Sequence, residues 1–128
     1  MAELERRVLI VDDDELNRLL LEHMVRQLGL QPLSATDGET AVQACAAQRF
    51  ALIMMDRRMP GLDGYEALAR IREVEAAAGR SPVPAILLSG DLDRPGDASP
   101  VEAGFVGALL KPFRLDDLST LVARVLGD

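Results

Sequence analysis

The sequence has few of the residues that build disulfides, soft-metal sites and aromatic binding surfaces. Among its 128 residues there is one cysteine, one histidine and no tryptophan, and aromatic residues make up 3%. A single cysteine, Cys45, excludes an internal disulfide and a cysteine-based metal cage, and we expect a buried structural thiol there. His23 has no second metal ligand or phospho-donor motif around it, so we interpret it as a partly exposed helix residue.

Long apolar runs and excess positive charge are also missing. No apolar stretch approaches the roughly 18 residues that a membrane-spanning helix needs, and the charged start does not resemble a signal peptide. We therefore expect a cytoplasmic domain without membrane insertion. The net charge of −7 argues against direct nucleic-acid binding, which requires a basic surface.

What the sequence does contain is a regular alternation of apolar runs with helical patterns. Strand signals cover 8–11, 31–35, 51–55, 83–88 and 105–110, and helical patterns cover 16–28, 41–48, 64–78 and 115–126. We expect Asp37–Gly38 to form a turn and the start of the second helix. Apolar strands that are each followed by a helix indicate a parallel sheet with helices on both faces. With right-handed crossovers this predicts one open, doubly wound α/β domain over residues 1–128.

Ionisable and hydroxyl side chains follow four of the predicted strands. Asp12 and Asp13 follow the first strand, Asp56 the third, Ser89 the fourth and Lys111, the only lysine of the chain, the fifth. Ligands of open α/β sheets bind at this edge, and a cluster of carboxylates without histidine or cysteine suits Mg²⁺. A lysine and a hydroxyl at the same edge suit a phosphoryl group.

Each of these residues also has a structural interpretation. The run Asp12–Asp14 could cap the following helix, Asp56 could belong to a turn, Ser89 could be a loop hydroxyl and Lys111 a surface charge. Those interpretations do not explain why all of them stand at strand ends.

Four motifs in this order resemble the receiver domain of two-component response regulators over nearly the whole chain. They are VLIVDDDELNR (8–18), LIMMDRRMPGLDG (52–64), AILLSG (85–90) and LLKPF (109–113). The resemblance implies a flavodoxin-like sheet with strand order 2-1-3-4-5. It also implies a phosphorelay signalling domain whose only chemistry is self-catalysed phosphorylation and dephosphorylation, not an enzyme.

The resemblance assigns the acidic residues to a phospho-acceptor and its metal. Asp56 would receive a phosphoryl group from a phosphohistidine on a histidine kinase or a histidine phosphotransfer protein. Asp13, Asp56 and the backbone carbonyl of Arg58 would ligate Mg²⁺ directly, with Mn²⁺ able to substitute. Asp12 would act mainly through a metal-bound water.

The same resemblance assigns the other strand-end residues to the phosphoryl oxygens. Ser89 would hydrogen-bond one oxygen and Lys111 would pair with another. The Lys111–Pro112 bond resembles one that is cis in the family.

Three features depart from the family's usual pattern. Ala108 stands where an aromatic switch residue is common, so that switch is absent. Pro95 and Pro100 interrupt the segment Leu92–Glu102, where the fourth helix is expected to be short, displaced or mobile. We also hypothesise that Arg58 and Asp91 bridge over the acceptor and slow hydrolysis, although two solvated side chains explain the pair equally well.

Two other function classes remain open at this point. A partner-binding pseudo-receiver would fit Ala108 and the interrupted helix. A phosphatase of the haloacid dehalogenase type would use the acids after the first strand, but Phe113 and Arg114 stand where that family places acids near the lysine. The sequence does not distinguish a stand-alone receiver from part of a larger protein, and it names neither the donor kinase nor the oligomeric state.

Overall fold

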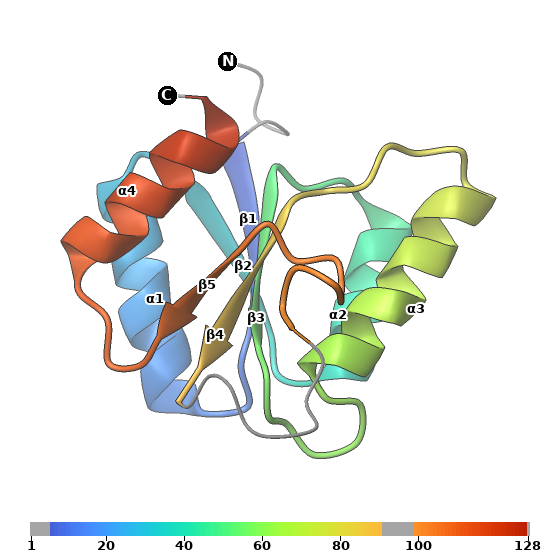
Figure 1. Cartoon of the computed structure of the whole chain (residues 1–128), viewed down its shortest axis with the longest axis horizontal. Coiled ribbons are helices and arrows are strands. Elements are labelled where there is room, and N and C mark those ends of the chain that lie inside the picture. The colour runs from blue at the N-terminus through green and yellow to red at the C-terminus, as the bar shows by residue number, and fades with distance from the viewer. Residues whose placement is uncertain (1–5, 91–98, 128) are drawn as a thin grey trace.

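A computed structural model describes residues 6–90 and 99–127 as a five-stranded parallel sheet between two layers of helices (Figure 1). The strand order is β2-β1-β3-β4-β5, the order that the family resemblance implies. The strands are β1 (Arg7–Val11), β2 (Gln31–Ala35), β3 (Leu52–Asp56), β4 (Ala85–Ser89) and β5 (Gly107–Leu110). The helices are α1 (Glu15–Gln27), α2 (Gly38–Ala47), α3 (Gly64–Ala77) and α4 (Leu115–Leu126).

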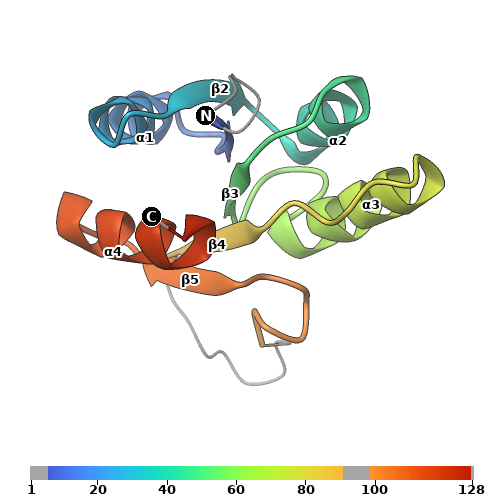
Figure 2. The same cartoon turned by 90° about the horizontal axis from the view of Figure 1, so that it is seen from above.

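The two faces of the sheet bury separate apolar layers, because successive side chains of a strand point to opposite sides. One layer packs beneath α2 and α3 and includes Leu9, Ile53 and Leu87. The other packs beneath α1 and α4 and includes Ile10, Met54 and Ile86. Seen from above, α1 and α4 lie on one side of the sheet and α2 and α3 on the other (Figure 2). The expected parallel sheet with helices on both faces is confirmed.

Strand and helix ends differ from the sequence prediction by a few residues at several places. The last helix has the expected bounds, and α2 begins at Gly38, at the predicted turn and helix start, where the Asp37 side chain caps it by accepting from the Thr40 amide at 2.7 Å. The third and fourth strands extend through Asp56 and Ser89. Both candidate site residues are therefore held by the sheet itself.

The predicted irregular helix over Leu92–Glu102 lies largely outside the described residues. The described part, Ser99–Gly104, forms turns: the Gly104 amide donates to the Val101 carbonyl at 3.0 Å and the Phe105 amide to the Pro100 carbonyl at 3.0 Å. Within 6–90 and 99–127, no helix has both the length and the apolar character needed to cross a bilayer.

Candidate functional site at the carboxyl edge of the sheet

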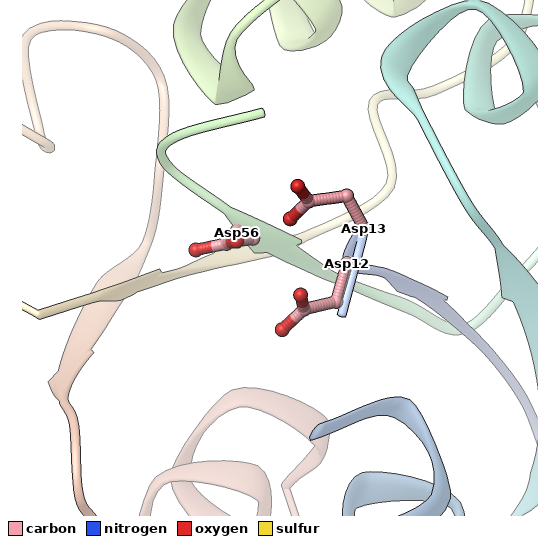
Figure 3. A group of neighbouring side chains, drawn as sticks. All are labelled: Asp12, Asp13 and Asp56. Carbon is pink, nitrogen blue, oxygen red and sulfur yellow. The ribbon is translucent and has the colours of Figure 1, made fainter. Parts of the chain in front are cut away.

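Parallel pairing of β1, β3, β4 and β5 brings the carboxyl ends of these strands to one edge. Asp56 ends β3 and Asp12 directly follows β1, and their side chains lie beside that of Asp13 (Figure 3). One carboxylate oxygen from each of the three lies within 4.8 Å of the others. The three acids predicted to form a cluster therefore do so.

The three consecutive acids after β1 have different roles in the fold. Asp12 is fully buried, and its Oδ1 accepts the Asp14 amide at 2.9 Å. Asp13 is exposed and faces the cluster. Asp14 is the N-cap of α1, where its side chain accepts the Leu16 amide at 3.2 Å. The acid run thus contributes Asp14 to the cap of α1 and Asp12 and Asp13 to the cluster.

Lys111 reaches the cluster from the loop after β5. Its Nζ lies 3.0 Å from Asp56 Oδ1 and 3.4 Å from Asp12 Oδ2. The Lys111 amide also donates to the Ser89 carbonyl at 2.7 Å, which extends the pairing of β4 and β5. The Lys111–Pro112 peptide bond is cis, as the resemblance implies.

Burial and the neighbouring charges shift the pKa values of Asp56 and Lys111. Burial raises the pKa of Asp56 above its ordinary value; the charges of Asp12 and Asp13 act in the same direction, and Lys111 opposes them. Burial acts to lower the pKa of Lys111, but its contacts with Asp56 and Asp12 outweigh that effect and raise it. Three carboxylates against one ammonium leave a formal charge of −2. The site therefore favours an added cation.

The remaining predicted residues lie at the carboxyl edge, within β5 or outside the described chain. Ser89 is buried at the end of β4, and Arg58 is an exposed residue two positions past Asp56. Ala108 is half-buried on β5, beside Leu87 of β4. Asp91 lies outside the described residues, so the proposed bridge from Arg58 to Asp91 stays a prediction.

The segment after Asp56 contains two residues whose roles the sequence did not reveal. Gly64, the first residue of α3, packs against the end of β3 so closely that an added Cβ would lie 2.5 Å from the Asp56 carbonyl oxygen. Arg57 is buried, with its guanidinium carbon 5.0 Å from the centre of the Tyr65 ring. The close packing of Gly64 could have been predicted from its place at the first position of a helix, directly after the N-cap Asp63. No sequence pattern indicated the burial of Arg57.

The cluster fits a hard divalent cation. Its ligand atoms are carboxylate oxygens, the type that Mg²⁺ prefers, and its negative charge is only partly compensated by Lys111. Asp12 and Asp56 are buried and fixed, while exposed Asp13 leaves the cluster open to solvent. This combination holds two ligand groups in place and leaves the third accessible from solvent.

A family model and the similar proteins agree on the kind of domain that this chain resembles. A family model described as the response regulator receiver domain matches residues 8–123. The sensor protein GacS of Pseudomonas syringae pv. syringae is 32% identical over 121 residues, which are 94% of this chain and 13% of that protein. The cyclic di-GMP phosphodiesterase response regulator RpfG of Xanthomonas campestris pv. campestris is 32% identical over 127 residues, 98% of this chain and 33% of that protein. The chain thus spans a third or less of these relatives.

Solved structures show the same architecture. The receiver domain of a sensor histidine kinase from Pseudomonas aeruginosa PAO1, with a magnesium ion coordinated in its active-site cleft, has a TM-score of 0.83 and 32% identity, covering 96% of this chain and 98% of that one. The receiver domain of a histidine kinase from Arabidopsis thaliana, complexed with Mg²⁺ and BeF₃⁻, has a TM-score of 0.84 and 27% identity, covering 96% and 91%.

Proposed function

This chain belongs to the response regulator receiver domain family, and on that premise we propose that Asp56 is its phospho-acceptor. The donor would be a phosphohistidine on a histidine kinase or a histidine phosphotransfer protein, and the reaction would require Mg²⁺. One observation carries the proposal: the Asp56 carboxylate ends a central strand within 3.0 Å of the Lys111 ammonium and beside Asp12 and Asp13. The domain acts in signalling and is not a conventional enzyme.

The proposed step is an in-line transfer between two proteins. A carboxylate oxygen of Asp56 attacks phosphorus, the bond from phosphorus to the imidazole nitrogen breaks, and the imidazole leaves with the bonding electron pair. The product is an acyl phosphate on Asp56. Such a transfer depends on positioning and charge neutralisation more than on covalent assistance.

The residues of the site supply that positioning and neutralisation. Asp12, Asp13, Asp56 and the backbone carbonyl of Arg58 would hold Mg²⁺, which when bound neutralises phosphoryl oxygen charge; Mn²⁺ would substitute. Lys111, which pairs with Asp56 in the free domain, would turn to a phosphoryl oxygen. The Ser89 hydroxyl would hydrogen-bond another. Hydrolysis by water would then return the domain to its starting state without a second enzyme.

The surface beside the site supports transfer from a protein donor. Leu16, Leu19 and Leu20 of α1 are exposed by 75%, 54% and 53%. Next to them is an apolar pocket of about 330 Å³ between α1 and the loop that carries Lys111. A donor protein docked on this surface would place its histidine near Asp56.

We also propose that residues 1–128 form one receiver domain. It would act in the cytoplasm, alone or within a longer protein.

The two alternative functions are less well supported. For a dehalogenase-type phosphatase, Asp12 and Asp14 would both have to serve the reaction, but the Asp14 side chain caps α1. A pseudo-receiver that only binds partners would agree with Ala108. It would not need Lys111, Asp12 and Asp56 held together in a buried cluster.

Labelling by acetyl phosphate tests the acceptor. The wild-type domain with Mg²⁺ is expected to take up one phosphoryl group per chain, as a linkage that hydroxylamine cleaves, and chelation should prevent the uptake. Asp56→Asn should abolish labelling, whereas Asp116→Asn, an exposed acid of α4 with the same change of charge, should leave it unchanged. Labelling that survives Asp56→Asn, or wild type that stays unlabelled, would contradict the proposal.

Transfer from a panel of phosphorylated histidine kinases would then identify the donor.

A further inference from the structure

One basic side chain of α1 contacts the acidic cluster through the main chain. Arg18 Nη1 donates to the main-chain oxygen of Asp12 at 2.8 Å. That oxygen belongs to the peptide unit that joins Asp12 to Asp13. We infer that Arg18 is a positioning residue: it holds this peptide unit and thereby sets the direction of the two carboxylates that would receive Mg²⁺. The inference rests on the proposed function.

The surroundings of Asp12 show what Arg18 contributes. The Asp12 amide donates to the Ala35 carbonyl at 3.2 Å, and the Asp12 carboxylate accepts the Asp14 amide at 2.9 Å and Lys111 Nζ at 3.4 Å. Since Asp12 is fully buried, water does not readily replace a lost donor to its carbonyl. Without Arg18 the buried carbonyl would lack that bond, and the peptide unit that carries both carboxylates would be held less firmly.

Positioning and simple charge predict opposite effects when Arg18 is removed. Loss of a positive charge near the cluster makes it more negative, so electrostatics alone would tighten Mg²⁺ binding. Loss of the hydrogen bond lets the Asp12–Asp13 peptide turn, so positioning predicts weaker binding. Groups that orient metal ligands without touching the metal commonly affect affinity in this way. The sign of the change therefore distinguishes the two effects.

The chain offers a control of matched charge on the same helix. Arg26 is exposed in the last turn of α1 and lies 3.9 Å from Glu22. Arg26→Ala changes net charge as Arg18→Ala does, but leaves the Asp12 carbonyl bonded. Arg18→Lys keeps both the charge and a donor, so it tests whether the hydrogen bond restores binding.

Calorimetric titration of Mg²⁺ into the four proteins is the first measurement. Arg18→Ala is expected to raise the Kd by about 10-fold, the lower end of what such orienting groups contribute. Arg18→Lys should recover most of the affinity, and Arg26→Ala should bind as the wild type does. A Kd for Arg18→Ala equal to or below that of the wild type would overturn the inference while leaving the proposed function intact.

Amide hydrogen exchange in the metal-free proteins is the second measurement, and it does not depend on Mg²⁺. The Asp14 amide, which is bonded to Asp12 Oδ1, should exchange faster in Arg18→Ala than in the wild type or Arg26→Ala. Unchanged exchange would mean that Arg18 does not hold the loop. If the wild type bound no Mg²⁺, the proposed function would fail, and exchange at Asp14 would still decide whether Arg18 restrains this segment.

Discussion

Replacing Gly64 with alanine should displace the acceptor strand, although the change adds only one methyl group. The new Cβ would lie 2.5 Å from the Asp56 carbonyl oxygen and 3.0 Å from the Arg57 Cα, where ordinary contact begins at 3.4 Å. Both neighbours are main-chain atoms, which cannot turn aside as a flexible side chain could. The start of α3 and the end of β3 must therefore move apart by about 0.9 Å, the difference between 3.4 and 2.5 Å.

Two opposing energies set the size of the effect. Alanine has a better helix propensity than glycine, worth at most about 1 kcal/mol within a helix and less at its first position. Overpacking against rigid neighbours costs about 1–3 kcal/mol. The expected net loss is about 1–2 kcal/mol, which for 128 residues lowers Tm by roughly 4–8 °C.

The rate of phosphorylation at Asp56 should fall more than the stability of the fold, because the displaced carbonyl belongs to Asp56 itself. A shift of about 1 Å at a reacting group can cost up to about 100-fold in rate. We therefore expect labelling of Gly64→Ala by acetyl phosphate to slow by about 10- to 100-fold.

Thermal unfolding and the rate of labelling by acetyl phosphate are the assays. Gly90→Ala is a matched control for stability, since a Cβ at that position would meet no atom of residues 6–90 and 99–127 within 4 Å, and its Tm should not fall. A Gly64→Ala protein that is as stable as the wild type and labels at the same rate would refute the reasoning.

Three further predictions concern the charged and buried groups. Because burial and then the neighbouring carboxylates raise the pKa of Asp56, the folded state binds its proton more tightly than the unfolded chain does, so metal-free protein loses stability as pH rises from 3.8 through the raised value. Asp56→Asn should therefore raise the metal-free Tm at pH 7 and flatten that part of the pH profile in thermal scans; a lower Tm would show that the carboxylate stabilises the fold. Lys111→Ala should tighten Mg²⁺ binding by about 10-fold in calorimetry, because a competing positive charge is removed, yet slow phosphorylation; weaker Mg²⁺ binding would contradict this. Burial raises the pKa of Cys45 to about 12, so a thiol reagent at pH 8 should react only as urea unfolds the protein, and rapid labelling of folded protein would contradict its buried position.

Much of the fold could be predicted because its cause is local. Apolar runs such as Leu52–Met55 are buried on both faces in a parallel sheet, and the alternation with helices restricts the possible topologies. Element boundaries were less accurate. The fourth strand was predicted to begin at Val83 but begins at Ala85; the Val83 amide donates to the Glu75 side chain at 2.9 Å, a contact that periodicity does not register.

The sequence predicted which residues form the candidate site better than it predicted the role of each one. Asp12, Asp13, Asp56 and Lys111 were all identified, because parallel strands end at one edge whatever the exact register. Which of three adjacent acids would cap α1 was not predictable, since all three stand close to the helix start. The structure assigns that part to Asp14 and buries Asp12.

The sequence by itself determined the residue types at the strand ends, and with them the chemistry of a carboxylate, hydroxyl and lysine site. Those identities follow from the order of residues alone. Only the tertiary structure decided how the groups meet, because the contacts join segments far apart in the chain. Lys111 lies 55 positions from Asp56 and bonds to it directly, and α3 approaches the acceptor strand closely only because Gly64 has no side chain. The hydrogen bond from Arg18 to the Asp12 carbonyl likewise depends on how the first turn of α1 lies relative to β1.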